Sequence, residues 1–197
     1  LSSQQDFVSA NMAITTSLEY DSYGNVVAAK DGKGNVVKFG YEATHTFPVS
    51  TTNVLGHTAS TTYDSGTGNV LSETDVNGFT TTYEYDVFGR LKKVVKPYDS
   101  SVYPTMSYEY AIDGKAPEKV VVKQREVSGK AETYDQVSLY DGFGKVVQVQ
   151  HDGEKGVIVQ NVFYDGLGRV VKEVNPSVVM GGGEYVTPQA VAGRSYG

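Results

Sequence analysis

The three histidines, His45, His57 and His151, are the first residues whose type suggests metal binding or acid–base catalysis. They are widely dispersed, and none forms the H-x-x-x-H or H-E-x-x-H spacing that places two imidazoles on one helix face. Each stands at or beside a turn or repeat position of the sequence. We therefore expect turn or surface roles for all three, with no metal, and we expect substitution of any one by alanine to change stability little.

Oxygen-rich and glycine-rich loops suggest ion or nucleotide binding, but each pattern is incomplete. Residues 31–35 read Asp-Gly-Lys-Gly-Asn, and Lys33 stands at the middle position, where a calcium loop needs an oxygen ligand. Gly142-Phe143-Gly144 and Gly166-Leu167-Gly168 contain the G-x-G of nucleotide loops, but neither opens a helix in a βαβ unit. We interpret all three segments as hairpin turns.

Pairs of carboxylates, such as Glu73 with Asp75, are the residues that a glycosidase needs on either side of a cleft. Nothing in the sequence places this pair across a cleft, and a repeated Asp is explained by turns. We also expect no Ser-His-Asp hydrolase, and the absence of Cys excludes disulfides, thiolate zinc sites and a cysteine nucleophile. The sequence therefore predicts no enzyme activity and no cofactor.

The composition favours strands over helices. The 197 residues include 31 Val, 17 Thr, 15 Tyr and 22 Gly, but only 7 Leu and 3 Ile. Val, Thr and Tyr fit a pleated, half-buried surface, whereas helices draw on Leu, Ala, Glu and Lys. The length is enough for one large domain or two small ones. We therefore predict an all-β chain.

Charge and hydropathy argue against two kinds of partner. The 23 acidic and 17 basic residues give a net charge of −6, which disfavours binding to nucleic acid. No apolar run approaches the roughly 20 residues of a membrane helix, and no signal peptide is visible. Because the chain begins at Leu1, we expect it to be a piece of a longer chain.

A repeat of Tyr-Asp followed by Gly is the strongest pattern in the chain. It recurs at 20–24, 85–89, 140–144 and 164–168, and at 63–68 with one extra residue. A half-repeat, Asp/Asn-x-x-Gly, lies between these at 31–34, 53–56 and 75–78. The Asp, Asn and Glu residues at positions 21, 31, 42, 53, 64, 75 and 86 follow at steps of 10, 11, 11, 11, 11 and 11. Such regularity predicts a repeat architecture.

The chemistry of the repeated residues predicts a hairpin turn at each. Asp or Asn at the first turn position bonds the backbone two residues on, and Gly at the fourth adopts positive φ. Turns about 11 residues apart leave strands of about 6–8 residues, so a unit of about 22 residues is one antiparallel hairpin plus the next turn. Residues 80–85 and 91–96 are two such predicted strands. The residues with a predicted structural role in the repeat are Tyr20, Asp21, Gly24, Asp31, Gly34, Asn53, Gly56, Tyr63, Asp64, Gly68, Asp75, Gly78, Tyr85, Asp86, Gly89, Arg90, Tyr140, Asp141, Gly144, Tyr164, Asp165, Gly168 and Arg169.

The aligned tyrosines have two interpretations. On one sheet face they form a ladder of cross-strand pairs, each worth about 0.2–1 kcal/mol. If exposed, the same ladder stacks on sugars or binds another protein. We favour the structural ladder, because Tyr stands at a fixed position just before the turn.

The pattern divides the chain into three segments. Residues 1–13 are an N-terminal extension, either a partner strand or disordered, and residues 14–176 are the hairpin array. An irregular insertion occupies about 97–135, with a longer hairpin expected around Ser128-Gly129. Residues 177–197 are a Gly-rich tail, which we expect to be mobile or to start a further repeat at Tyr185.

The motif Tyr-Asp-x-x-Gly-Arg/Asn-Val/Leu resembles that of the RHS/YD-repeat family. Arg follows Gly in residues 85–91, Tyr-Asp-Val-Phe-Gly-Arg-Leu, and in residues 164–170, Tyr-Asp-Gly-Leu-Gly-Arg-Val. The resemblance extends over roughly residues 14–176. It implies a long, twisted and curved antiparallel strip that forms part of a hollow shell around a toxic domain, or that scaffolds a surface protein. With about seven or eight units the chain is too short to close a shell, and without Asp-Pro it lacks the family's autoproteolysis motif.

Two functions follow as expectations. The first is a non-catalytic scaffold, a segment of an RHS-type shell that encapsulates or presents a toxin or effector domain, in a secreted or cell-surface bacterial protein. Its partners are other repeats of the parent chain, an enclosed toxin domain and, through open sheet edges, other copies. The alternative is an extracellular adhesion module that binds carbohydrate or a receptor. The charge and hydropathy of the chain predict neither a nucleic-acid partner nor a membrane span.

Overall fold

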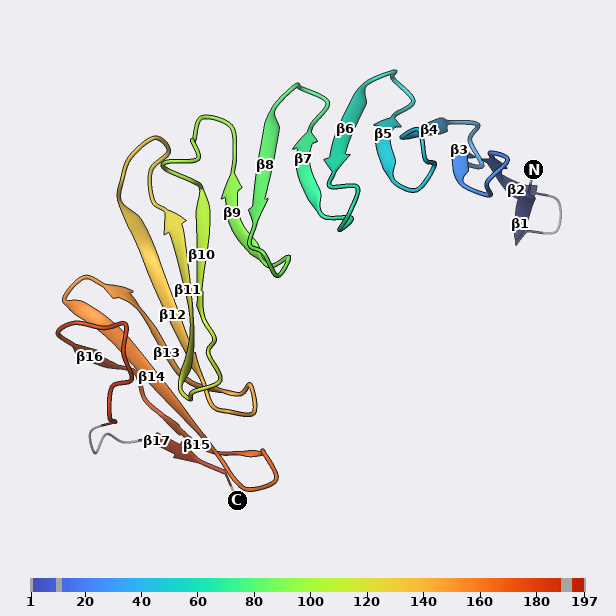
Figure 1. Ribbon diagram of the computed structural model, residues 1–197. Helices are drawn as coiled ribbons and strands as arrows, with labels where there is room; N and C mark the ends of the chain where they lie inside the picture. The colour runs from blue at the N-terminus through green and yellow to red at the C-terminus, as the bar shows by residue number, and fades with distance from the viewer. Residues whose placement is uncertain (1, 10–11, 189–192, 197) are drawn as a thin grey trace. The chain divides into compact units, whose positions relative to one another are not determined.

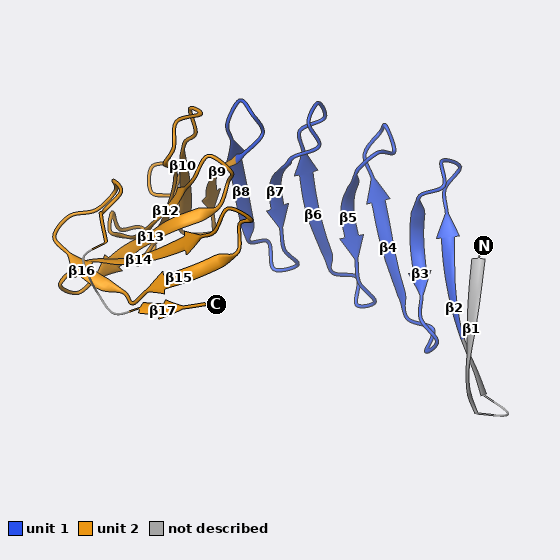
Figure 2. Ribbon diagram, turned by 90° about the horizontal axis from the view of Figure 1, so that it is seen from below, with its two compact units in different colours: residues 1–90 blue, residues 91–197 orange. Residues whose placement is uncertain are grey.

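The structure is a computed structural model that describes residues 2–9, 12–188 and 193–196. These residues form β-strands joined by turns, and none of them is helical. The strands fall into two compact units, Leu1–Arg90 and Leu91–Gly197 (Figures 1 and 2). The prediction of an all-β chain of antiparallel hairpins is therefore confirmed. Nowhere in the described residues is there a helix long and apolar enough to cross a membrane.

The first unit is a succession of hairpins in chain order, as Figure 2 shows. Each strand pairs antiparallel with the next, from the first pair to the pair β7–β8. The strands are β1 (Ser2–Ser9), β2 (Met12–Tyr20), β3 (Val26–Lys30), β4 (Val36–Tyr41), β5 (Pro48–Thr52), β6 (Thr58–Tyr63), β7 (Val70–Thr74) and β8 (Thr80–Tyr85).

The second unit continues the antiparallel order and then departs from it. Strands β9 to β15 pair in chain order, whereas β16 pairs with the first half of β14 and β17 pairs with β15. The strands are β9 (Leu91–Val95), β10 (Met106–Ala111), β11 (Glu118–Arg125), β12 (Thr133–Tyr140), β13 (Val146–Gly153), β14 (Gly156–Tyr164), β15 (Val170–Val174), β16 (Ser177–Val179) and β17 (Gly193–Ser195).

A bulge accompanies the tyrosine that ends the first strand of a hairpin. Glu19 pairs with Ala28, but the next residue, Tyr20, pairs with Val26, so one residue of β3 is extra. The same shift occurs one residue before the turn in four further hairpins, at Tyr41, Tyr63, Tyr140 and Tyr164. Because a bulge increases local twist, its recurrence twists each unit in a regular way.

The two units differ in how much side-chain surface they bury. Among the described side chains of residues 15–90, Ala28 is the only one that is buried. In the second unit Leu139 and Val159 are each 1% exposed, and the polar side chains of Gln148, Gln150 and Asn161 lie between them. A compact core is therefore a property of the second unit.

The segments that looked irregular in the sequence contain ordered strands. β10, β11 and the first residues of β12 lie within 97–135, and the β11–β12 hairpin turns at Gly129, whose φ is 73°. Residues 180–188, which follow β16, contain no strand, and their backbone is bonded to side chains of β13. That a further repeat starts at Tyr185 stays a prediction. No pattern in the sequence predicts these bonds between the segment and β13. Domain boundaries at 13/14 and 176/177 remain predictions.

Candidate functional site: the Tyr-Asp turns

Two backbone hydrogen bonds close each three-residue turn. At the first turn, the N–H of Asp21 donates to the carbonyl of Asn25 at 2.9 Å, and the N–H of Gly24 donates to the carbonyl of Asp21 at 3.2 Å. The same pair of bonds closes the turns at 31–35, 53–57, 75–79, 86–90, 141–145 and 165–169. The glycine of each has a φ between 76° and 89°, a region that costs other residues energy.

The turn carboxylate satisfies the backbone donors at the tip. In the 86–90 turn, Oδ1 of Asp86 accepts the N–H groups of Phe88 and Arg90 at 2.9 and 3.0 Å, and Oδ2 accepts Nε of Arg90 at 2.7 Å. Asp165 with Arg169 repeats this arrangement, and Asp21 with Asn25 and Asp31 with Asn35 use the amide in place of the guanidinium. In these four turns the residue after Gly is Arg or Asn, and its side chain caps the second carboxylate oxygen.

These donors shift the carboxylates toward the charged form. The backbone N–H of Arg169, followed by its side chain, lowers the pKa of Asp165, and the side-chain amide of Asn35 lowers that of Asp31. At Asp86 partial desolvation raises the pKa, but the N–H donors of Arg90 and Phe88 outweigh it and leave the pKa below its usual value. Hydrogen bonding to the charged form is the general cause.

The turn at residues 42–47 is longer than the three-residue turns, and a glutamate accepts its hydrogen-bond donors. Glu42 takes the place of Asp, and Oε1 accepts the Thr44 hydroxyl at 2.7 Å and the N–H groups of Thr46 and Phe47 at 2.7 and 3.0 Å. Thr44 contributes most, and together these donors lower the pKa of Glu42 to about 2. His45 occupies the position of the turn glycine, with a φ of 57°.

Asp64 closes the other turn that has an extra residue. Its N–H donates to the carbonyl of Asn69 at 2.8 Å, and Gly68, with a φ of 76°, donates to the carbonyl of Asp64 at 2.8 Å. The hydroxyl and N–H of Thr67 both donate to Oδ1 of Asp64, at 2.9 and 2.8 Å. In this longer turn Thr67 therefore provides two of the hydrogen-bond donors to the Asp64 carboxylate.

Four tyrosine hydroxyls each bond the first residue of a strand that follows the previous turn on the same edge of the sheet. Tyr41 donates to the carbonyl of Val26 at 3.3 Å, and Tyr85 donates to the carbonyl of Val70 at 2.9 Å. In the second unit, Tyr110 bonds the carbonyl of Leu91 at 2.8 Å and Tyr164 bonds that of Val146 at 2.9 Å. The sequence predicted a ladder of cross-strand side-chain pairs for the motif tyrosines, and this hydroxyl role was missed.

Side chains after the turn glycine also reach the next turn. Nδ2 of Asn25 donates to the carbonyl of His45 at 2.7 Å. Nζ of Lys145 donates to the carbonyl of Gly168 and lies 5.0 Å from the centre of the Tyr164 ring. In both cases the acceptor is the positive-φ residue of the next turn on the same edge, so one pair of neighbouring turns is bonded in each unit.

The remaining motif tyrosines lie at bulges. Tyr20 and Tyr140 pair with Val26 and Val146 where the register shifts. The ring of Tyr63 stacks on that of Phe47, with 4.9 Å between the ring centres.

Half-repeat residues Asn53 and Asp75 each accept two backbone N–H groups through Oδ1.

The histidines are placed singly. Nδ1 of His45 lies 3.1 Å from Oδ2 of Asp21, and its ring stacks on Tyr23 at 4.2 Å. The backbone N–H of His57 donates to Asn53, and His151 lies within β13 with its ring 5.9 Å from that of Tyr134. Within the part of the chain that the structure describes, no three His, Cys, Asp or Glu side chains are grouped so as to hold a metal ion.

The carboxylates considered for glycoside hydrolysis have separate tasks. Oε2 of Glu73 accepts the hydroxyl of Tyr83 at 2.6 Å, and this bond raises the pKa of Tyr83 to about 12. Asp75 instead accepts the backbone N–H groups of Asn77 and Phe79. The pair therefore does not converge on one site.

One motif with the spacing of a catalytic serine was overlooked in the sequence. Residues 193–197 read Gly-Arg-Ser-Tyr-Gly, which is the G-x-S-x-G spacing of a hydrolase nucleophile elbow. That elbow requires a sharp turn from a strand into a helix. Here Gly193–Ser195 is strand β17, paired with Lys172–Val174 of β15, so the described serine lies in extended backbone.

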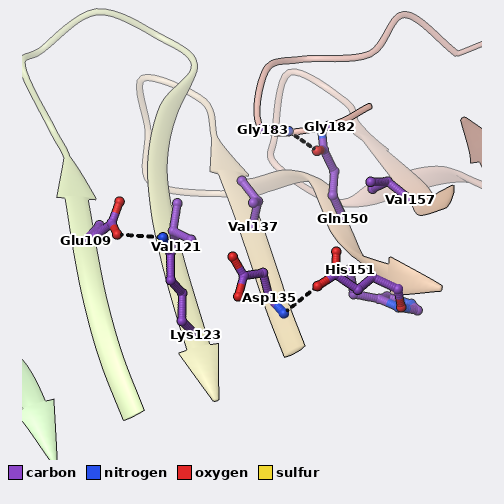
Figure 3. A pocket seen from close by; sticks show the side chains of 11 residues that line it. Glu109, Val121, Lys123, Asp135, Val137, Gln150, His151, Val157, Gly182 and Gly183 are labelled. Carbon is purple, nitrogen blue, oxygen red and sulfur yellow. Dashed lines mark hydrogen bonds and ion pairs between the residues drawn. The ribbon is translucent and has the colours of Figure 1, made fainter. Parts of the chain in front are cut away.

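A pocket of about 320 Å³ in the second unit gathers ionisable side chains that the sequence did not bring together (Figure 3). Nζ of Lys123 lies 3.0 Å from Oε1 of Glu109, and the backbone N–H of Asp135 donates to Oδ2 of Asp152 at 2.8 Å. The bond to Glu109 raises the pKa of Lys123, so this lysine is a cation and a poor nucleophile.

Comparison with known proteins agrees with the repeat geometry. Residues 63–101 match the RHS Repeat family, and this stretch contains the turns that begin at Tyr63-Asp64 and Tyr85-Asp86. A search of curated proteins found no match.

Solved structures of toxin complexes share the fold. The crystal structure of TcdB2–TccC3 is 14% identical with a TM-score of 0.67, over 88% of this chain and 12% of that chain. TcdB2–TccC3 without the hypervariable C-terminal region is 12% identical with a TM-score of 0.69, over 88% and 14% of the two chains. The Tc holotoxin pore of Photorhabdus luminescens, with a substitution in TccC3, is 16% identical with a TM-score of 0.62, over 84% and 9%.

The protein therefore spans only a small part of the solved chains that it resembles, and at these identities the likeness establishes the fold alone. The family resemblance of the motif is confirmed directly at residues 63–101. Residues 63–101 match the RHS Repeat family, and they lie within an antiparallel β-hairpin array that has the fold of the TcdB2–TccC3 chains.

Proposed function

We propose that the chain is a non-catalytic wall segment of an RHS-type β-shell, which encloses or presents a toxin or effector domain of a longer bacterial protein. The observation that carries this proposal is the bonding of one turn to the next along an edge, as between Asn25 and the carbonyl of His45. Such bonds fix the spacing of hairpins without a thick core. They suit a wall better than a globular enzyme.

The sparse burial in the first unit supports the same function. Side chains of residues 15–90 are half-buried or exposed, apart from Ala28. A sheet with so little buried apolar surface gains limited stability from its own packing. In a shell, further repeats of the parent chain pair with its edges and an enclosed domain covers one face.

Limited proteolysis of the full-length protein that carries this chain tests enclosure. The expected result is that the segment C-terminal to the repeats resists protease, with cleavage confined to turn tips such as Val87-Phe88. The matched variant is Val94→Pro, which removes a ladder donor from the buried centre of β9 and opens the wall. Equal cleavage of the C-terminal segment in both proteins would contradict enclosure.

A secreted adhesion module is the second candidate, and one observation favours it. Phe47 and Tyr63 stack at 4.9 Å and line a pocket of about 680 Å³ in the first unit, together with Val49 and Thr61. Aromatic faces beside polar groups are typical of carbohydrate sites. Binding on a glycan array that is lost in Phe47→Ala and retained in Phe143→Ala, at an exposed turn tip, would favour adhesion over the shell.

A further inference from the structure

Three buried amide side chains occupy one face of the second unit. Gln148 and Gln150 of β13 are 0% and 1% exposed, and Asn161 of β14 is 2% exposed. Their cross-strand neighbours Leu139 and Val159 are apolar and equally buried. Burying an amide is costly unless its donors and acceptors are bonded.

The segment that follows β16 supplies bonds to both glutamines, and Figure 3 shows the one between Gln150 and Gly183. Oε1 of Gln150 accepts the N–H of Gly183 at 2.7 Å, and Nε2 of Gln150 donates to the carbonyl of Glu184 at 2.7 Å. Oε1 of Gln148 accepts the N–H of Val186 at 2.9 Å, and Nε2 of Gln148 donates to the carbonyl of Val186 at 2.7 Å. Each glutamine therefore binds one donor and one acceptor of the crossing main chain.

The two glutamines also fix each other. Nε2 of Gln150 donates to Oε1 of Gln148 at 2.7 Å, and Nε2 of Gln148 donates to Oδ1 of Asn161. These bonds between amide side chains orient Gln148 and Gln150 independently of the segment that binds them. A satisfied and buried polar network of this kind is rigid and specific.

Two further contacts define what the site accepts. A Cβ on Gly182 would lie 2.8 Å from Oε1 of Gln150 and 3.0 Å from both Cγ atoms of Val157, so this position needs glycine. Nζ of Lys119 donates to the carbonyl of Gly183 at 3.0 Å and lies 2.8 Å from Oε1 of Glu184. The site therefore favours glycine followed two residues later by a carboxylate.

We propose that the face formed by β12, β13 and β14 is a binding site for a peptide main chain, recognised by Gln148 and Gln150, and that Gly182–Val186 occupies it in cis. Because all four glutamine bonds go to backbone atoms, the site binds a glycine- and acid-containing peptide in trans once its own segment is displaced. This proposal does not depend on the shell function.

The test uses the full chain with Gly182→Val, which excludes the resident segment by its clash with Gln150 and Val157. A fluorescently labelled peptide with the sequence of residues 180–188, Met-Gly-Gly-Gly-Glu-Tyr-Val-Thr-Pro, is titrated and its anisotropy measured. We expect saturable binding to Gly182→Val and little to the unaltered chain. Adding Gln148→Ala or Gln150→Ala to Gly182→Val should weaken binding on the order of tenfold or more, and adding Gln160→Ala, at an exposed position of β14, should not.

Equal binding to the altered and unaltered chains, no binding to Gly182→Val, or indifference to both glutamine substitutions would overturn the proposal. Hydrogen exchange in the otherwise unaltered chain provides a second test if Gly182→Val does not fold. The amides of Gly183 and Val186 should exchange more slowly than that of Tyr185. Protection of Val186 should be lost in Gln148→Ala and that of Gly183 in Gln150→Ala, with both retained in Gln160→Ala. Equal exchange of the three amides in the unaltered chain would also overturn it.

Discussion

The hydroxyl of Tyr85 donates a 2.9 Å hydrogen bond to the carbonyl oxygen of Val70. Tyr85 stands directly before one Asp turn, and Val70 begins the strand that follows the preceding Tyr-Asp turn. The motif residue therefore has a task beyond its own hairpin, since it fixes where the next turn stands relative to the last. Asp86, its neighbour, organises the turn itself.

Substitution Tyr85→Phe removes this hydroxyl and leaves the ring. Because the carbonyl of Val70 loses its partner, we expect a loss of about 1 kcal/mol in the free energy of unfolding, measured by urea denaturation. Tyr23→Phe is the control, because this ring is 69% exposed at a turn tip, and we expect a change within about 0.5 kcal/mol. Equal effects of the two substitutions would refute the linking role of Tyr85.

Glycines of one turn offer a matched pair. Gly144 has a φ of 77°, whereas Gly142 has no positive φ, and an added Cβ meets no atom within 4 Å at either position. Gly144→Ala should therefore destabilise by about 1 kcal/mol through backbone strain alone, and Gly142→Ala should not. Gly89→Val, at a φ of 76°, should cost about 1 kcal/mol or more for the same reason. Thermal melts of the three variants check this, and a parental melting temperature for Gly144→Ala and Gly89→Val would show that the turn geometry is wrong.

Acid should destabilise the array in a defined pH window. The pKa of Glu42 falls from its ordinary 4.5 to about 2 in the folded chain, and the pKa values of Asp31, Asp64 and Asp165 are also lowered. A lowered folded-state pKa contributes stability that is complete above the unfolded pKa and disappears as pH falls through the folded one. Stability should therefore be insensitive to these groups above about pH 5 and should fall between about pH 4.5 and 2.

The variant Glu42→Gln separates this effect from general acid denaturation. It is uncharged at every pH, so its stability should fall less steeply between about pH 4.5 and 2 than that of the parent. Denaturation curves at a series of pH values give the comparison. Parallel pH profiles for the two proteins would mean that the Glu42 carboxylate does not stabilise its turn.

The histidines should no longer be treated as equivalent. The sequence predicted little effect for any His→Ala substitution, but His45 has a φ of 57°, stacks on Tyr23 and lies 3.1 Å from Asp21. We now expect His45→Ala to destabilise by about 1 kcal/mol, because alanine keeps the same backbone strain and loses the ring stack and the bond to Asp21. His57→Ala is the control, since His57 bonds Asn53 through its backbone N–H and carbonyl, which alanine retains. Equal melting temperatures for the two variants would exclude the role of His45.

The hairpin array could be predicted because its turns depend on local chemistry. Asp, Gly and the residue after Gly act within five residues of one another, so their spacing already determines the loop. The predicted strands 80–85 and 91–96 match β8 and β9 almost to the residue. Glu42 fitted the repeat spacing, although its extra methylene group matches a longer loop in a way that only the structure explains.

Long-range contacts could not be predicted in the same way. The bond from Gln148 to Val186 joins residues 38 positions apart, and no periodicity relates them. The tyrosine hydroxyl bonds span 15 to 19 residues, and their only signal was the fixed position of Tyr before Asp. Ser195 is an opposite example, because its G-x-S-x-G spacing is typical of a catalytic serine but the residue lies on a strand paired with β15.

Cryo-electron microscopy of the full-length protein that carries this chain tests the central proposal most directly. We predict that residues 14–176 form part of the wall of a closed β-sheet shell, with density for a further domain inside it. A map in which these hairpins stand in solvent as a separate module, with neither sheet face covered by other repeats or by an enclosed domain, would contradict the account.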